Sequence, residues 1–157
     1  MGTYSKSLGN DLVSKGVWHH FVEFDEPVRT VEQAASKVPV EKIVKSIVMI
    51  DSDDRPFLAI VRAESRLSFK KIKKILEVRD VRLATPSEVL KSSGYPAGGV
   101  PPFNRIQRVL LDPNVLENEV CFVGGGDVDK LLEVRTADIV ETLKPKIADI
   151  SRISSLG

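Results

Sequence analysis

Short apolar runs alternate with polar turns along the chain, and their spacing predicts strands mixed with short helices. Runs rich in Val and Ile predict strands, and apolar positions at helical spacing behind a capping residue predict helices. The predicted strands span residues 17–24, 43–50, 56–62, 81–83, 106–111, 120–123 and 131–134. The predicted helices span residues 5–15, 30–37, 68–76, 85–91 and 136–143, with one helical turn at 113–116. No element is predicted after Pro145.

Turn and capping residues mark the boundaries of these elements. The polar stretch 51–55 between two β-rich runs is typical of a hairpin turn. Four helices begin at a hydroxyl residue that is predicted to cap them: Thr30, Ser68, Thr85 and Thr136. Because hairpins are mixed with helices without a strict βαβ repeat, we expect an α+β fold. This would be one domain over residues 1–157 with a mixed, largely antiparallel sheet flanked by helices, and barrel-like closure is one option.

Composition narrows the choice of partners. The 157 residues carry a formal net charge of +1, so no field of the whole protein favours nucleic acid or a membrane, and any such binding must come from a local patch. The single cysteine excludes an internal disulfide framework, and no apolar stretch has the length of a membrane helix. We expect a cytoplasmic protein with one sizeable core.

The densest cluster of backbone-directing residues is the stretch 93–105, Ser-Gly-Tyr-Pro-Ala-Gly-Gly-Val-Pro-Pro-Phe-Asn-Arg. Proline fixes φ and glycine allows a ligand to approach the main chain, so together they can present N–H groups to a negative charge. A surface loop that needs unusual dihedral angles explains the composition equally well. The glycine run 124–126 has the same two interpretations.

Lys45 lies on an apolar stripe of its predicted strand, because alternation places it on the face of Ile43, Ile47 and Met49. An ammonium at such a position either meets an anion in a site or extends along the strand to water. A second basic feature is the helix 68–76, whose lysines occupy the face opposite its apolar residues. These lysines suit either phosphate binding or solvent.

The chain lacks the usual motifs of covalent, phosphate-loop and metal chemistry. His19 and His20 are neighbours on a predicted strand, so their side chains point to opposite faces and are poorly placed to share a metal. If the protein is an enzyme, these absences favour positioning and electrostatic stabilisation over covalent catalysis.

In order and spacing, five stretches resemble the YbaK/ProX-like aminoacyl-tRNA deacylases, which also occur as the editing domain inserted in many bacterial prolyl-tRNA synthetases. The stretches are Val44-Lys45-Ser46-Ile47-Val48, residues 82–89, residues 94–103 with Gly98-Gly99-Val100-Pro101-Pro102-Phe103, Asp112, and the glycine turn 124–126. The resemblance covers about residues 21–143 and leaves 1–17 as an extra N-terminal segment. Pro101 departs from the family, many members of which have a small residue there. Asp127 and Asp129 lie near the place of an acidic residue that some members carry, whereas Leu131 is the alternative occupant.

The resemblance implies a trans-acting enzyme that hydrolyses the ester of mischarged tRNA carrying a small amino acid, without a cofactor or a metal. Its implied catalytic residues are Lys45, Gly98 and Gly99, with the substrate's own ribose hydroxyl assisting. The implied substrate-binding residues are Phe21, Val100, Pro101, Pro102, Phe103, Gly125 and Gly126. The basic face of the helix 68–76 adds Lys70, Lys71 and Lys74 as candidate tRNA contacts. The implied partners are the 3′ end of aminoacyl-tRNA and, as an option, a synthetase, but neither DNA nor a membrane. One alternative is a non-catalytic module of the same fold that binds aminoacyl-tRNA or a synthetase and regulates it, and another is a small-ligand binding protein with no RNA partner.

Overall fold

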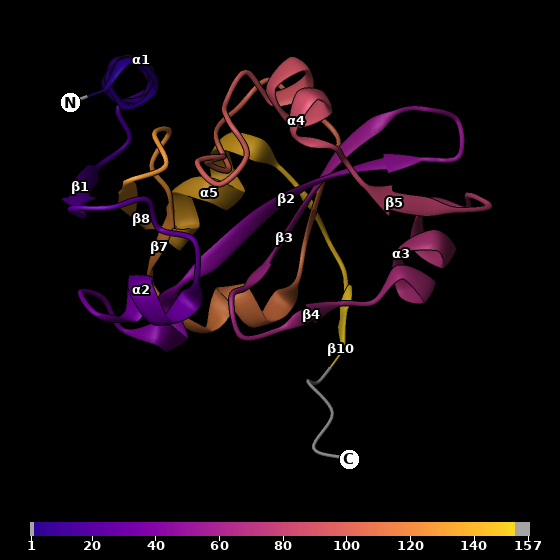
Figure 1. The fold of residues 1–157 in the computed structure, drawn as a ribbon. Coiled ribbons are helices and arrows are strands. Elements are labelled where there is room, and N and C mark those ends of the chain that lie inside the picture. Colours follow the sequence, from indigo (N-terminus) through magenta and orange to yellow (C-terminus); the bar gives the residue numbers. More distant parts are fainter. Residues whose placement is uncertain (1, 153–157) are drawn as a thin grey trace.

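A computed structural model describes residues 2–152 and contains two main β-sheets with helices around them (Figure 1). The larger sheet has the strand order β5 (Val81–Leu83), β2 (Val44–Asp51), β3 (Pro56–Arg62), β6 (Val109–Leu111) and β9 (Lys146–Ile147). The smaller sheet has the order β1 (His19–Glu23), β8 (Lys130–Arg135) and β7 (Val120–Gly124). The two-residue strands β4 (Arg66–Leu67) and β10 (Ser151–Arg152) pair with each other.

Five helices in the described residues pack around these sheets. They are α1 (Thr3–Ser14), α2 (Val31–Ala35), α3 (Phe69–Leu76), α4 (Pro86–Ser93) and α5 (Thr136–Leu143), with 3₁₀ turns η1 (Val40–Lys42) and η2 (Pro113–Glu117). Strands β2 and β3 form an antiparallel hairpin, and β3–β6 and β6–β9 are parallel pairs. The predicted α+β class with mixed, largely antiparallel sheets is therefore confirmed, and the two sheets stay open instead of forming a barrel.

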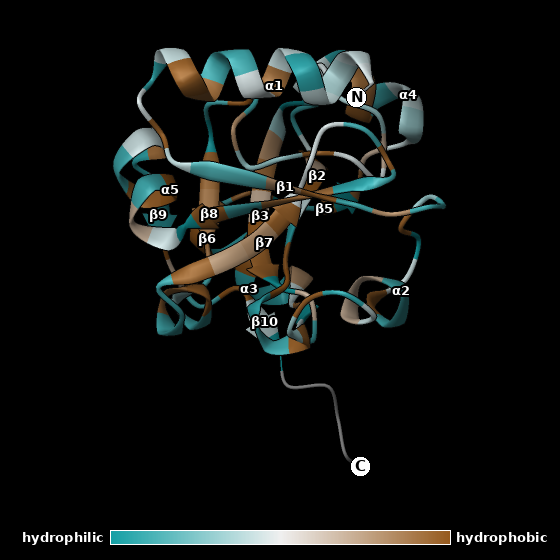
Figure 2. Ribbon diagram, turned by 90° about the vertical axis from the view of Figure 1, so that its left-hand side faces the viewer, coloured by the Kyte–Doolittle hydropathy of each residue, from teal (hydrophilic) through white to brown (hydrophobic). Residues whose placement is uncertain are grey.

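The main hydrophobic core lies between the two sheets. It takes residues from β2, β3 and β6 on one side and from β7 and β8 on the other, and α1, α4 and α5 pack against it. Figure 2 shows α1 lying across one end of the apolar strands. A second cluster on the opposite face of the larger sheet includes Ile72 of α3, and a third, smaller cluster lies under α2. None of the helices in residues 2–152 is long and apolar enough to cross a membrane.

Local sequence signals account for most of the helix starts. Thr30 and Thr85 each form a complete capping box, and the Ser68 side chain accepts a hydrogen bond from the Lys71 N–H. The prediction that Thr136 caps its helix is wrong. Thr136 is buried as the first helical residue, and its hydroxyl donates to the Asn118 carbonyl oxygen at 2.6 Å, so tertiary packing has claimed the group that would cap.

Two other predictions differ from the structure at the level of elements. The strand expected at 106–111 begins only at Val109, because the Ile106 N–H donates to the side chain of Asn104 in a local turn. Strands β9 and β10, in the part of the chain for which no element was predicted, and strand β4, which was not predicted either, exist through pairing with segments distant in sequence.

Candidate active site

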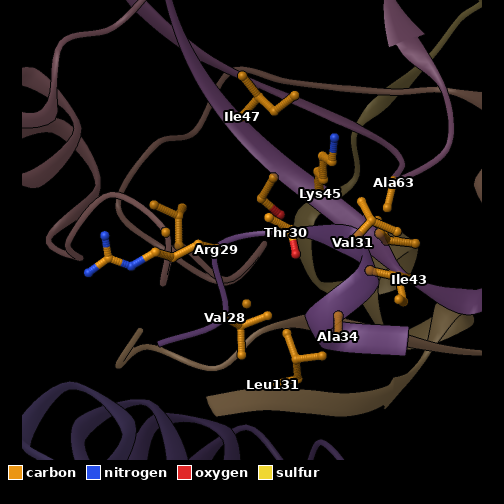
Figure 3. Close-up of a pocket in the computed structure, with 15 residues that line it drawn as sticks. Val28, Arg29, Thr30, Val31, Ala34, Ile43, Lys45, Ile47, Ala63 and Leu131 are labelled. Carbon is orange, nitrogen blue, oxygen red and sulfur yellow. The ribbon is translucent and has the colours of Figure 1, made fainter. Parts of the chain in front are cut away.

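A cavity of about 470 Å³ lies where α2, the start of β2 and the Gly/Pro loop meet the ends of β7 and β8. Figure 3 shows these segments with the side chains that line the cavity. The lining residues are Val28, Arg29, Thr30, Val31, Ala34, Ile43, Val44, Lys45, Ser46, Ile47, Ala63, Gly98, Val100, Gly124 and Leu131. Cavities of this size commonly bind small molecules or parts of larger ligands.

The lining is apolar on one side and positively charged on the other. Val28, Ala34 and Leu131 lie together in the lower part of Figure 3, whereas Lys45 and Arg29 extend from separate segments above them. The lining contains these two cations and no carboxylate. Such a site attracts an anionic ligand and accepts a small apolar group beside it.

Lys45 lies in the part of β2 that extends beyond strand β5. Strand β5 pairs only with the last residues of β2, from Met49 to Asp51, and a final bond joins the Ala84 N–H to the Val48 carbonyl oxygen. The edge of residues 44–47 that faces away from β3 thus has no partner strand in the larger sheet; β7 of the smaller sheet bridges to Ile43 just before it, and the cavity lies beside this edge. Lys45 is exposed and forms no salt bridge within residues 2–152.

Ser46 offers polar groups to the same edge. Main-chain groups of alternate residues on a strand point to the same side, so the N–H and C=O of Ser46 share the direction of the Val48 carbonyl and point toward the open edge. The Ser46 hydroxyl is buried and has no hydrogen-bond partner among the described residues. Buried hydroxyl groups normally have a partner, which makes Ser46 a candidate ligand contact.

The start of α2 fixes the second cation. The Gln33 side chain accepts hydrogen bonds from the N–H groups of Arg29 and Thr30 at 2.7 and 3.0 Å, and the Thr30 hydroxyl accepts from the Gln33 N–H at 3.1 Å. This capping box holds the backbone of Arg29 and Thr30 against the cavity, while the Arg29 guanidinium stays exposed to a ligand.

The Gly/Pro loop and the glycine turn touch through their main chains. The Gly126 N–H donates to the Gly99 carbonyl oxygen at 2.8 Å. A Cβ on Gly99 would lie 2.2 Å from the Gly126 oxygen, and a Cβ on Gly124 would lie 2.2 Å from the Val100 oxygen. These glycines are required because two backbone segments approach more closely than any side chain permits.

Hydrogen bonding decides which loop N–H groups are available to a ligand. The Gly99 N–H donates to the Pro96 carbonyl oxygen at 3.0 Å, and the Gly125 N–H donates to the Lys130 carbonyl oxygen at 3.1 Å. The N–H groups of Gly98 and Val100, which both line the cavity, have no acceptor among the described residues. Gly98 has a φ of +90°, a conformation that glycine adopts without strain.

The structure brings some of the predicted site residues together and separates others. Lys45, Gly98 and Val100 line the cavity. Gly99, Gly125 and Gly126 form the layer of main chain behind it. The side chains outside the lining are Pro101, Pro102, Phe103 and Phe21: the first three are buried, with Phe103 in the main core, and Phe21 packs beneath Gly9 of α1.

The predicted tRNA-contacting lysines lie on α3, which is far from α2 in Figure 1 and lines no part of the cavity. Lys70 and Lys74 are exposed. The Lys71 ammonium instead contacts the Asp149 carboxylate and the Ser151 carbonyl oxygen, both at 2.8 Å, so it ties α3 to the C-terminal strand.

Sequence reasoning missed the contributions of Arg29, Thr30, Ser46 and the apolar floor. The capping box at Thr30 was the only local signal for Arg29, because it predicts that Arg29 directly precedes the start of a helix. Three residues were candidates for the place where some family members carry an acidic residue, and of these Leu131 lines the cavity. The Asp127 carboxylate instead accepts a hydrogen bond from the Ser5 N–H, and the Asp129 carboxylate pairs with the Lys130 ammonium at 3.0 Å. No cluster of three or more His, Cys, Asp or Glu in residues 2–152 is arranged to hold a metal ion.

An α+β fold whose cavity joins an unpaired lysine to a glycine-rich main-chain wall defines the class of protein. Residues 25–142 match the aminoacyl-tRNA editing domain family, and the chain belongs to this YbaK/ProX-like family. The proline--tRNA ligase of Thermotoga neapolitana is 35% identical over 104 residues, which cover 65% of this chain and 18% of that ligase. The chain therefore matches less than a fifth of the length of this relative.

Relatives of similar size to this chain also exist. The uncharacterized protein YwhH of Bacillus subtilis is 28% identical over 123 residues, which cover 76% of this chain and 78% of YwhH. A crystal structure of a candidate trans-editing enzyme for prolyl-tRNA synthetase superposes with a TM-score of 0.87 at 25% identity, covering 97% of this chain and 99% of that one. Because this structural match covers 97% of the chain, it extends beyond residues 25–142 and includes most of the N-terminal helix region as well.

Proposed function

We propose that the protein is a trans-acting aminoacyl-tRNA deacylase that removes a small amino acid from mischarged tRNA. The observation that carries the proposal is the lining of the cavity, which combines an unpaired Lys45, a small apolar floor, and Gly98 and Val100, whose main-chain N–H groups have no acceptor among the described residues. An aminoacyl ester at the 3′ end of a tRNA has matching parts: a phosphodiester anion, a carbonyl group and a side chain.

Hydrolysis of this ester by water needs stabilisation of the negative charge that develops on the carbonyl oxygen, and it needs no nucleophilic side chain. Water adds to the ester carbonyl carbon, the carbonyl oxygen becomes negative, and the bond to the ribose oxygen breaks to release the amino acid and the tRNA hydroxyl. The N–H groups of Gly98 and Val100 are the donors for this oxyanion, since the Gly99 N–H is already bonded to Pro96. Loss of one such donor typically lowers the rate by about 10²- to 10³-fold.

The proton of the attacking water is assigned to the substrate. The cavity lining contains no His, Cys, Asp or Glu side chain, so a neighbouring ribose hydroxyl of the substrate is the proposed proton relay. Lys45 and Arg29 hold the charged 3′ end, and the Ser46 hydroxyl and main-chain groups contact the aminoacyl-adenosine portion. This division leaves the protein to bind, orient and stabilise charge.

The size of the accepted amino acid follows from the floor of the cavity. Val28, Ala34 and Leu131 leave room for a small group, and Ala34 and Leu131 are buried in the cluster under α2, which resists expansion. A synthetase separates amino acids that differ by one methylene only about 10- to 200-fold, so a second site that admits the smaller product improves fidelity. The exposed Lys70 and Lys74 extend the tRNA contact, and a cytoplasmic location and an association with a synthetase remain predictions.

A panel of aminoacyl-tRNAs tests the proposal. The full chain is incubated with radiolabelled Ala-, Ser-, Cys- and Pro-tRNA, and ester loss is compared with buffer alone. We expect acceleration with at least one of the small aminoacyl groups. If none is hydrolysed faster but salt-sensitive binding of aminoacyl-tRNA persists, the non-catalytic binding module replaces the enzyme.

A further inference from the structure

Helix α1 lies outside the family match and contacts the glycine turn through a buried serine. Ser5 is 0% exposed. Its hydroxyl donates to the Gly125 carbonyl oxygen at 2.6 Å and accepts from the Asp127 N–H at 3.1 Å, and its own N–H donates to the Asp127 carboxylate at 3.0 Å. One side chain and one main-chain group thus fix both ends of the turn.

The contact between α1 and the turn is close and mutual. Gly126 has a φ of +94°, and a Cβ there would lie 2.9 Å from the main-chain carbon of Tyr4. The helix begins at Thr3 behind the N-cap Gly2, which has no side chain to cap it, and the Asp127 carboxylate supplies an acceptor for the Ser5 N–H in the first turn. A negative charge at a helix N-terminus is favourable, so the helix and the turn stabilise each other.

The turn passes this restraint to the cavity wall. The Gly126 N–H holds the Gly99 carbonyl oxygen at 2.8 Å, and Gly99 lies between Gly98 and Val100, which line the cavity. A second link joins the same helix to the Gly/Pro loop, since the rings of Tyr4 and Tyr95 pack with their centroids 6.1 Å apart. Two consecutive residues of α1 therefore contact the two segments that make up this wall.

We propose that Ser5 is a positioning residue for deacylation, which holds the glycine turn so that the Gly98 and Val100 N–H groups keep their place. This inference rests on the proposed function. Ser5 lies behind the wall and outside the cavity lining, so it acts through the turn and touches no reacting atom. Without the Ser5 hydroxyl the Gly98 and Val100 N–H groups are held less firmly, and these groups are needed most in the transition state. We therefore expect kcat and selectivity to change more than KM.

The test compares Ser5→Ala with Ser7→Ala, which removes an exposed hydroxyl from the same helix. All variants are assayed at a temperature at which circular dichroism reports them fully folded. With Ala-tRNA we expect Ser5→Ala to lower kcat about 10- to 100-fold with little change in KM, the scale of a misplaced catalytic geometry. The preference for Ala-tRNA over a bulkier aminoacyl-tRNA should fall as well, and Ser7→Ala should match the original protein in both respects.

Amide hydrogen exchange supplies a measurement that does not depend on activity. Ser5→Ala should speed exchange of the Asp127 and Gly126 amides about tenfold, as expected for the loss of a hydrogen bond and its neighbour, whereas Ser7→Ala leaves them unchanged. Asp127→Ala gives a second variant that should speed the Gly126 amide if Ser5→Ala fails to fold. Unchanged exchange would show that Ser5 does not restrain the glycine turn, and faster exchange with unchanged kcat and selectivity would overturn the positioning role. If the original protein hydrolyses none of the tested esters, the proposed function fails, while the exchange data still decide whether Ser5 restrains the turn.

Discussion

Gly99 and Gly126 are joined by a main-chain hydrogen bond of 2.8 Å that leaves no space for a side chain on Gly99. This bond connects the Gly/Pro loop, which follows α4, to the turn between β7 and β8. Two segments more than twenty residues apart in sequence thus form one wall of the cavity. The wall is made of main chain, so its shape depends on backbone contacts.

Substitution at Gly99 should therefore destabilise the fold as well as the site. In Gly99→Ala the new Cβ would lie 2.2 Å from the Gly126 oxygen, so the loop and the turn must separate. We expect a loss of about 1–3 kcal/mol in the free energy of unfolding, the usual range for overpacking. Gly9→Ala is the control: its Cβ meets the Phe21 ring at 3.4 Å, and alanine should raise helix stability by about 0.5–1 kcal/mol. Urea denaturation followed by circular dichroism measures both, and equal stabilities would contradict this account of the wall.

Lys45→Ala should lower the deacylation rate without unfolding the protein. Lys45 is exposed and unpaired within the described residues, so its removal breaks no structural contact but deletes a charge from the cavity lining. We expect kcat/KM to fall by about 10²-fold, in keeping with the loss of one charged contact to the substrate. Lys146→Ala, which changes an exposed lysine on strand β9, is the matched control. Full activity of Lys45→Ala would show that this lysine merely extends to solvent.

The floor of the cavity should control selectivity. Val28→Ala removes two methyl groups from a partly buried lining residue and keeps its main-chain bond to the Val128 carbonyl oxygen at 2.8 Å. We expect the ratio of kcat/KM between a bulkier and a smaller aminoacyl-tRNA to rise about tenfold, which is the scale of one or two methylene groups in a pocket. Val13→Ala, at an α1 position that is 70% exposed, should leave the ratio unchanged. A ratio that stays constant in Val28→Ala would remove this residue from the amino-acid pocket.

The single cysteine should be unreactive in the folded protein. Burial raises the pKa of the Cys121 thiol to about 11. The pKa of Cys121 is about 8.5 in the unfolded chain and higher in the folded protein, so the thiol stabilises the native state at pH values below about 8.5. This contribution to the free energy of unfolding is lost as the pH rises from there to about 11. Thiol labelling at pH 8 should proceed only at the rate of unfolding and become rapid in denaturant. Rapid labelling of the native protein would contradict the buried position of Cys121.

Much of the fold could be predicted because its signals are local. The capping boxes at Thr30 and Thr85, and the hairpin turn between β2 and β3, each depend on residues close together in sequence. The two-residue strands β9 and β10 could not be predicted in this way, since the pairing of Leu110 with Lys146 carries no local pattern. The Thr136 hydroxyl shows the same limit, because its partner Asn118 lies on another element.

The site residues likewise divide into those that sequence motifs indicate and those that only tertiary packing brings to the cavity. Lys45 and Gly98 could be identified from the sequence motifs, and both line the cavity. Arg29 and Leu131 lie in this lining only because tertiary packing brings α2 and the smaller sheet to the residue before β2, Ile43, and a single sequence does not reveal that arrangement. Which glycine N–H groups are free also depends on tertiary hydrogen bonds, such as the one from Gly99 to Pro96.

The early end of strand β5 has a consequence for self-association. Beyond the parallel bridge between Ile43 and Phe122 of β7, the edge of β2 up to Val48 has no paired strand, and an unpaired edge is a template on which a strand of a second molecule can add. Lysine is a residue with which proteins commonly block such addition, and Lys45 lies on this edge. We therefore expect the charge that we assign to substrate binding to oppose self-association as well, and Lys45→Ala should be checked by gel filtration before its activity is interpreted.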